Sequence, residues 1–331
     1  LTLTWTYSSG TAFVAGETFV FSTTAPVFDA TGLGAALDGL ETTPLDHEYV
    51  HVVGALSASL AGTVKTSIDS LVSQGIYRWW MGEVRDQDLA GAESIATWQS
   101  SIQGAFASFT HDRCGALVAC AGRFRDRITG ALLRRSLAHA IGPRLGSLIH
   151  AKNGAGLAEH PGRVASGPLP YVEDDSLVHD FRTYTGLDLY RFMGAQTLPP
   201  DLLHKYIATE RSMAANGSDY SSVMNVRVIT AMERAALAAI TRYVNDNPEV
   251  QTNGRLTAKA AAAMNAYVTA QVSAALTRPN GVPMALNVRA LVNTTDNLVN
   301  TRQLRFTITG TPYGYASTVT ATVGFRLNTG S

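Results

Sequence analysis

The chain has 331 residues, with 26 basic and 26 acidic side chains, a balanced formal charge and a hydrophobic fraction of 46%. Because only 16% of the residues are charged and the two signs balance, the composition lacks the basic surface that broad nucleic-acid binding requires, and we expect no nucleic-acid partner. The length allows two or three domains, each with its own core. No apolar run reaches the length of a transmembrane helix and no signal-peptide pattern opens the chain, so we expect no direct membrane insertion.

The first half of the chain alternates between short apolar stretches and amphipathic ones. Leu33, Leu37 and Leu40 recur at helical spacing after Asp29 or Thr31, either of which can cap a helix. Predicted strands cover 17–21, 48–53, 76–81 and 116–121. Predicted helices cover 29–41, 57–74 and 91–109, and Ser57 can cap the second of them. This alternation predicts an α/β fold whose N-terminal half is a largely parallel sheet covered by helices.

The two cysteines, Cys114 and Cys120, are six positions apart. This spacing is not that of a metal site. On a strand, residues six apart stand about 20 Å from each other, beyond the reach of a disulfide. We therefore expect both to be small buried hydrophobic side chains in a reducing compartment.

The second half of the chain reads as helices followed by strands. Leucines 132, 133 and 137 with Ile141 predict a helix over 131–149, and the glycines and prolines of 142–170 indicate a linker. Longer helices are predicted at 221–246 and 257–276, the second of which Thr257 can cap, and strands at 286–292, 303–309 and 317–327. The expected organisation is an N-terminal arm or linker (1–10), an α/β core domain (11–150), a mixed or helical part (151–285), and a C-terminal sheet with an intersubunit arm (286–331).

Both ends of the sequence alternate between apolar residues and threonine. At the C-terminal end the apolar positions are Val319, Ala321, Val323, Phe325 and Leu327, and at the N-terminal end they are Leu1, Leu3, Trp5 and Tyr7. This period of two is typical of a half-buried strand. Because an extended terminal strand is an unpaired edge that recruits another strand, the pattern predicts a protein that binds copies of itself.

One motif suggests an enzyme instead. His47-Glu48-Tyr49-Val50-His51 matches the H-E-x-x-H pattern in which two histidines on a helix bind zinc and the glutamate activates a water. The β-branched and aromatic residues of this stretch favour a strand, on which His47 and His51 would stand about 13 Å apart, too far for one zinc ion. We therefore favour a core strand and keep a zinc-dependent metallohydrolase as the alternative.

Other chemical signals are weak. Five arginines cluster at 123, 125, 127, 134 and 135, which we interpret as a solvated or ion-paired surface. The chain contains no Walker A motif and no G-x-G-x-x-G fingerprint. We therefore expect no cofactor and no enzymatic activity.

Residues 209–240 resemble the C-terminal half of contractile phage tail sheath proteins. The run Glu210-Arg-Ser-Met-Ala-Ala-Asn-Gly-Ser-Asp-Tyr220, then Asn225-Val-Arg-Val-Ile229 and an Ala-rich helix, is similar to the pattern that opens the helical part of that family. Further similarities lie in Gly16–Pro26, in Glu48–Gly54 and in Asn253-Gly-Arg-Leu256. Pro312-Tyr-Gly-Tyr315 departs from the family's P-L-G-Y ending by lacking the leucine.

The resemblance implies a structural polymer. Sheath subunits stack in six-fold rings around a tail tube, and their terminal arms add strands to sheets of neighbouring subunits. It further implies the tail tube protein, the baseplate and the tail terminator as partners, a place in a virion tail or a related injection system, and assembly in the host bacterial cytoplasm. Contraction of the tube would drive membrane penetration and the delivery of a genome or of effectors. Another self-assembling shell or secretion-sheath protein is a third possibility.

Overall fold

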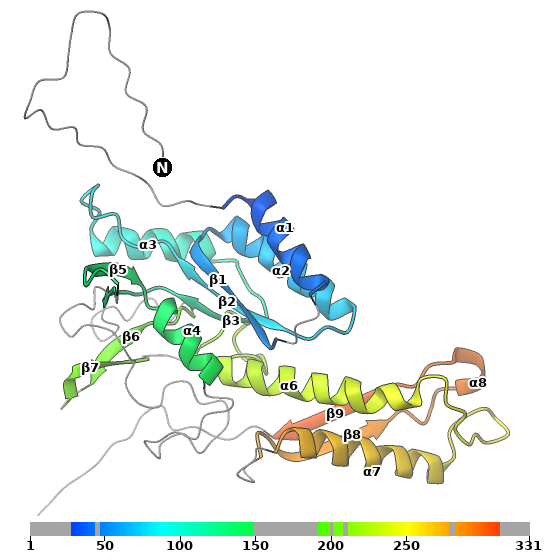
Figure 1. Cartoon of the computed structure of the whole chain (residues 1–331). Helices are drawn as coiled ribbons and strands as arrows, with labels where there is room; N and C mark the ends of the chain where they lie inside the picture. Colours follow the sequence, from blue (N-terminus) through cyan, green and yellow to red (C-terminus); the bar gives the residue numbers. More distant parts are fainter. Residues whose placement is uncertain are drawn as a thin grey trace, which may run out of the picture.

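The centre of the molecule is a parallel sheet. The computed structural model describes residues 28–43, 47–126, 128–147, 191–198, 201–207, 211–277 and 283–311. Strands β1 (Tyr49–Leu56), β2 (Trp79–Val84) and β3 (Cys114–Val118) pair in parallel in the order β1-β2-β3 (Figure 1). Every residue of β2 and β3 is buried, as parallel sheets require when helices cover both faces. The predicted α/β class with a parallel sheet is confirmed.

Helices cover both faces of this sheet. Helices α1 (Ala30–Glu41), α2 (Ala58–Ser73) and α3 (Ile95–Phe106) lie on one side, and α4 (Ala138–Ser147) and α6 (Val223–Ile240) on the other (Figure 1). Helices α1 and α2 begin where the sequence predicts, whereas α3, predicted at 91–109, begins at Ile95 after its cap Ser94. Asp29, Ser57 and Ser94 each accept a hydrogen bond from the backbone N–H three residues on, which satisfies a donor that the first helical turn leaves unpaired.

Several predicted strands differ in position from those of the structure. The strand predicted at 76–81 begins later, at Trp79, because pairing with β1 starts only where Tyr49 meets Trp79. The stretch predicted as one strand at 116–121 is divided between β3 and β4 (Ala121–Arg125), since the chain leaves the parallel sheet after Val118 and enters a separate hairpin.

The helix predicted at 131–149 is present only in its second half. Residues Leu132–Ser136 form β5, which pairs antiparallel with β4, and only Ala138–Ser147 is helical. The leucine spacing fits a helix, but pairing with β4 decides the local structure. A second hairpin, β6 (Ala195–Leu198) with β7 (Asp201–Ile207), was not predicted.

The C-terminal elements follow the sequence closely. Helix α7 (Ala258–Ala275) is capped by Thr257 as predicted, and β8 (Leu286–Val292) has the predicted bounds. Strand β9 (Phe306–Thr311) begins three residues late, after the short helix α8 (Leu298–Thr301). Helix α6 ends at Ile240 in a 3-10 turn, η1 (Thr241–Tyr243), rather than at 246. The strands predicted at 17–21 and 317–327, and most of the linker predicted at 142–170, lie outside the described residues.

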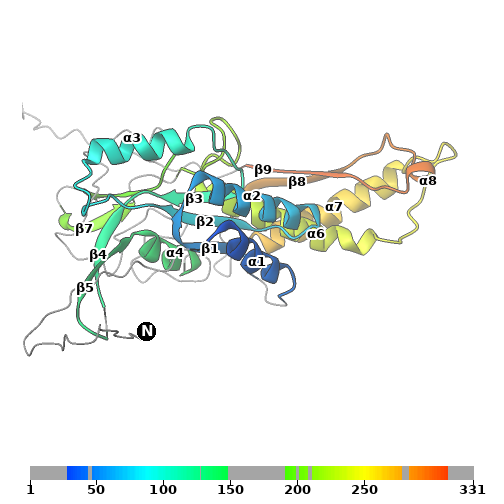
Figure 2. The same cartoon turned by 90° about the horizontal axis from the view of Figure 1, so that it is seen from above.

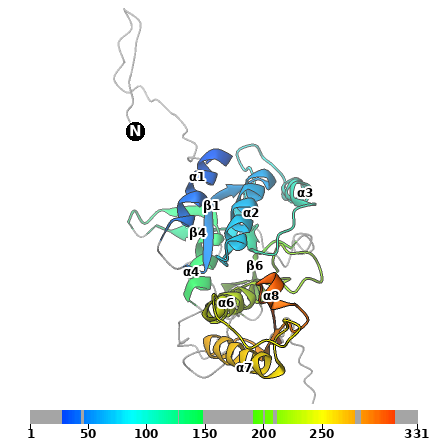
Figure 3. The same cartoon turned by 90° about the vertical axis from the view of Figure 1, so that its right-hand side faces the viewer.

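Helix α6 belongs to two hydrophobic cores. Its first turns contribute Val223, Met224 and Val226 to the core around the parallel sheet. Its later turns contribute Ala236 and Ala239 to a second core with α7, β8 and β9. Figure 3 shows α6 between the sheet region and α7, and Figure 2 shows α7, β8 and β9 extending away from the parallel sheet. The helix therefore joins the two parts of the molecule.

The first core is rich in aromatic and sulfur-containing side chains. The indole rings of Trp79, Trp80 and Trp98 are fully buried. Cys114 and Cys120 are thiols buried in the same core, which confirms the predicted burial; the reducing compartment stays a prediction. Thiols in such surroundings act as small hydrophobic groups, and burial raises the pKa of the Cys114 thiol.

A buried ionic contact holds α6 against the sheet. The guanidinium of Arg227, only 1% exposed, lies 3.5 Å from the Glu48 carboxylate and donates to the Leu145 carbonyl of α4 at 3.2 Å. Glu48 also accepts a hydrogen bond from the Trp79 indole N–H at 3.1 Å. Tyr49 donates from its hydroxyl to the Gly142 carbonyl at 2.7 Å, so α4 is held at a second point.

Replacing Arg227 by methionine should strongly destabilise the protein, because it removes the cation that compensates Glu48. Loss of one partner of a buried pair costs about 3–5 kcal/mol. Urea denaturation of the unassembled full chain measures the effect. The matched control is Arg305→Met, since Arg305 is 64% exposed and 3.7 Å from Asp296; there we expect about 0–1 kcal/mol. Equal losses in the two variants would contradict the assignment.

Candidate assembly interface

The H-E-x-x-H motif lies at the start of β1 and is not helical. His47 and Glu48 precede the strand and His51 is its third residue, so the strand prediction is confirmed. Glu48 is engaged by Trp79 and Arg227 rather than free to activate a water. In the ranges that the structure describes, no group of three or more His, Cys, Asp or Glu side chains could hold a metal ion. The geometry therefore gives no support to the zinc hydrolase alternative.

His51 has a structural environment. Its ring centroid lies 6.3 Å from that of His139 on α4, in an edge-on arrangement. Burial lowers its pKa, His139 acts in the same direction, and the Glu83 carboxylate opposes both. Glu83 is itself buried and accepts a hydrogen bond from the Gly54 N–H at 2.7 Å, where the backbone φ of Gly54 is +122°. The cluster therefore supports the irregular part of β1, where its register with β2 shifts.

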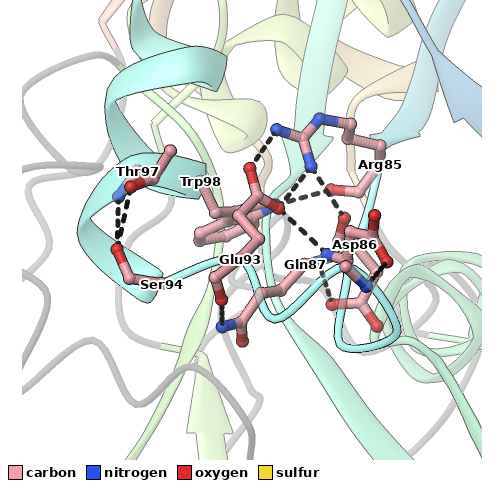
Figure 4. A network of polar contacts seen from close by, with 9 residues as sticks. Arg85, Asp86, Gln87, Glu93, Ser94, Thr97 and Trp98 are labelled. Atoms are coloured by element: carbon pink, nitrogen blue, oxygen red, sulfur yellow. Dashed lines mark hydrogen bonds and ion pairs between the residues drawn. The ribbon is translucent and has the colours of Figure 1, made fainter.

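A dense polar network orders the loop between β2 and α3. Arg85 donates two hydrogen bonds of 2.7 Å to the Glu93 carboxylate, which also accepts from the Asp88 N–H at 2.9 Å (Figure 4). The Trp98 indole donates to the Arg85 carbonyl at 3.0 Å, joining the loop to α3. The hydrogen bonds from Arg85 are the main reason why the pKa of Glu93 falls to about 2.

The arginine cluster lies on the β4–β5 hairpin. Arg134 donates to both carboxylate oxygens of Asp86, at 2.5 and 2.8 Å, and so links the hairpin to the β2–α3 loop. Arg125 donates to the Gly130 carbonyl at 3.2 Å. The Arg134–Asp86 pair agrees with the predicted ion-paired surface, whereas Arg125 bonds a backbone carbonyl; Arg127 lies outside the described residues.

The β8–β9 hairpin has one face packed against the helices and one face exposed. Alternate residues of the hairpin face the helices: Val288, Ala290 and Val292 of β8, and Phe306 and Ile308 of β9. The opposite face is exposed and carries the three threonines of β9. In the described part of the chain, this two-stranded sheet has no third strand.

A groove of about 540 Å³ lies between α6 and β9. Its walls are largely apolar and include Val228, Met232 and Leu237 from the helix and Phe306 and Ile308 from the strand. Leu237 is 41% exposed and lines this groove. Sequence reasoning missed this groove, although the alternation in Phe306-Thr-Ile-Thr-Gly-Thr311 signals a strand with one apolar and one threonine face.

The end of the groove is polar. Glu233 forms a bidentate pair with Arg113, at 2.5 and 2.6 Å, and accepts from the Tyr220 hydroxyl at 3.3 Å. Burial is the main reason why the pKa of the Tyr220 hydroxyl is raised to about 12. The Arg113 guanidinium lies 5.3 Å from the centre of the Tyr220 ring. This cluster ties α6 to the residue before β3, so the groove is built on a rigid wall.

The terminal residues predicted to exchange strands lie outside the described part of the chain. These are Leu1, Leu3 and Trp5 at one end and Val319, Ala321, Val323, Phe325 and Leu327 at the other. Their role therefore stays a prediction. Among the described helices, none is long and apolar enough to cross a membrane.

Comparison with solved structures identifies the fold. A chain of the PVC sheath complex of an extracellular contractile injection system, in its contracted state, matches with a TM-score of 0.59 and 11% identity over 89% of this chain and 75% of that one. A chain of the six-fold symmetrised baseplate of the anti-feeding prophage matches at 0.57 and 12% identity over 90% and 74%. The contracted helical sheath of the same prophage matches at 0.54 and 13% identity over 92% and 77%.

These matches confirm the predicted resemblance at the level of fold. No family model matches the sequence, and no curated protein matches it. The similarity is therefore carried by the three-dimensional arrangement, and the chain has a contractile tail sheath fold.

Replacing Glu93 by glutamine should lower stability in a pH-dependent way. The folded pKa of Glu93, about 2, lies below its ordinary value of 4.5. Its ionised form therefore stabilises the fold fully above about pH 4.5, and this contribution is lost as the pH falls toward 2. Thermal denaturation from pH 7 to pH 3 should show a difference from the wild type that shrinks with acidification. Asp38→Asn, at an exposed position of α1, is the control. A difference that does not change with pH would contradict the prediction.

Proposed function

We propose that this protein is a structural subunit of a contractile sheath, which polymerises into a helical tube around an inner tube and contracts. The observation that carries the proposal is the match of about nine tenths of the chain to the PVC and anti-feeding prophage sheaths, at 89% and 92% coverage. The alternating termini and the exposed β8–β9 hairpin support it, because each subunit would both donate and accept strands.

Strand exchange explains how such a lattice holds together while it changes shape. The terminal segments 1–7 and 318–327 would add to the β8–β9 sheet of neighbouring copies. Head-to-tail contacts of this kind do not close and so generate helical filaments. Backbone hydrogen bonds between subunits persist when the globular bodies rotate, since the arms that connect them reorient without breaking the added strands.

The partners follow from this arrangement. The inner face of the tube would contact a tail tube protein, and its ends would contact a baseplate and a terminator. Assembly would take place in the host bacterial cytoplasm, in the tail of a virion or a related injection machine. Contraction would drive membrane penetration and delivery of a genome or of effectors. We infer that the subunit acts without a cofactor or catalysis, since stored lattice energy supplies the motion.

Removing residues 318–331 should abolish tube formation and leave the monomer folded. The described core ends at Thr311, and the deleted segment lies beyond it. Negative-stain electron microscopy of the purified protein detects tubes, and circular dichroism verifies the fold. Removing only 329–331, which spares the alternating stretch, is the matched control. Normal tubes from the longer deletion would refute the role of the C-terminal arm, and closed shells in place of tubes from the intact chain would refute the sheath.

A further inference from the structure

The β4–β5 hairpin presents its arginines mainly on one face. In an antiparallel pair, residues directly opposite each other share a face, as do residues two apart along one strand. Arg123 lies opposite Arg134. Arg125 and its partner Leu132 follow on the same face. Phe124 belongs to the other face and packs against the first core, so the arginine face, formed by Arg123, Arg125 and Arg134, points away from that core.

The positive charge of the arginine face is only partly compensated within the subunit. Arg134 forms an ion pair with Asp86. The one carboxylate of the described hairpin, Asp126, bonds to groups of its own turn. Arg123 is exposed and forms no ion pair with any residue that the structure describes. Because like charges directly opposite each other on paired strands are destabilising, Arg123 beside Arg134 has a cost that a carboxylate from outside would reduce.

Helix α1 carries the opposite charge. Residues 28–43 contain three acidic side chains and no lysine or arginine. Asp38 is exposed, Glu41 is half-buried, and neither forms an ion pair with a described residue. The two lie three positions apart, so they are neighbours on the helix surface with about 5–6 Å between their Cβ atoms. Arg123 and Arg125, two apart on a strand, are spaced by about 6.7 Å. The two pairs of charges are therefore opposite in sign and similar in spacing.

A glycine beside these two carboxylates has no packing role among the described residues. Gly34 lies four positions before Asp38 and seven before Glu41, which places the three on one stripe of α1. A Cβ atom at Gly34 would meet no described atom within 4 Å. Glycine inside a helix is destabilising relative to alanine, so the packing described for this subunit does not call for it. A glycine at this position lets the backbone of another chain come close to the carboxylates.

We propose that the arginine face of one copy docks, through Arg123 and Arg125, on the stripe of α1 in a second copy that carries Gly34, Asp38 and Glu41. This inference rests on the proposed sheath function and adds to it a contact between the globular bodies. Figures 1 and 2 show the hairpin at one end of the sheet region and α1 toward the other, so the contact is head-to-tail. Contacts of this kind propagate into rings or filaments.

The strength of such a contact follows from its exposure. Ion pairs at the surface are individually weak and are screened by salt. Charges at the rim of an interface act mainly on the rate of association and on register. The contact between the arginine face and α1 would therefore align neighbouring copies, and it would break and re-form readily when the lattice changes its state.

Charge reversal with rescue tests the pairing. Two full-length double variants, Arg123→Glu/Arg125→Glu and Asp38→Lys/Glu41→Lys, each place like charges at the contact, and their combination in one chain restores opposite charges. At an ionic strength of about 0.1 M, where charges act over about 10 Å, we expect the pelleted fraction of assembled protein to fall several-fold in each double variant and to recover in the combination. Arg135→Glu is the matched control, because Arg135 is exposed on the opposite face of the same hairpin.

Carbodiimide cross-linking identifies the contact directly. Full-length Arg123→Lys protein keeps the positive charge and supplies an amine that a carbodiimide joins to a carboxylate in contact with it. Mixing copies with light and heavy isotopes separates links between copies from links within one. We expect mass spectrometry to find a light–heavy link from position 123 to Asp38 or Glu41, and none from position 135 in Arg135→Lys protein. Circular dichroism verifies that each variant is folded, and where a reversed variant is not, the cross-link decides.

The outcomes separate this contact from the proposed function. Wild-type tubes combined with unimpaired reversed variants, with no recovery in the combination, or with links from position 123 only to other carboxylates would overturn the inference and leave the sheath function standing. Light–heavy links in the absence of tubes would support the contact and contradict the tube. Absence of both tubes and links would overturn the inference together with the proposed function.

Discussion

The structure depends on one helix being buried against two cores at once. The first turns of α6 pack under the parallel sheet, and its later turns pack against α7 and the β8–β9 hairpin. Two ionic contacts fix its position, Arg227 with Glu48 and Glu233 with Arg113. Because the interior is close-packed and transmits strain, the hairpin cannot move relative to the sheet without disrupting one of the cores.

This rigidity matters for the proposed function. A contracting lattice needs bodies that keep their shape and connections that change their angle. In this protein the β8–β9 hairpin packs on the same helix, α6, that also packs under the parallel sheet, so a force applied to the hairpin would reach the sheet through that helix.

The zinc motif shows how a short pattern misleads outside its context. Five residues match, but β-branched neighbours favour a strand, and the strand separates the two histidines. Glu48 instead has a structural role, because its carboxylate accepts a hydrogen bond from the Trp79 indole and lies beside the buried guanidinium of Arg227. The spacing of Leu132, Leu133 and Leu137 predicts a helix where the structure has a strand, because Leu132–Ser136 pairs with β4.

The sequence by itself determined the elements whose causes are local. The caps at Asp29, Ser57 and Thr257 and the alternation over 286–292 predict α1, α2, α7 and β8, because capping and periodicity act within a few residues. Only the tertiary structure decided that Asn265 and Thr269 of α7 accept hydrogen bonds from the backbone of β8 and that α6 leaves a groove beside β9. Those features arise from contacts between segments more than twenty positions apart, and no local pattern encodes which strand edge a distant helix will cover.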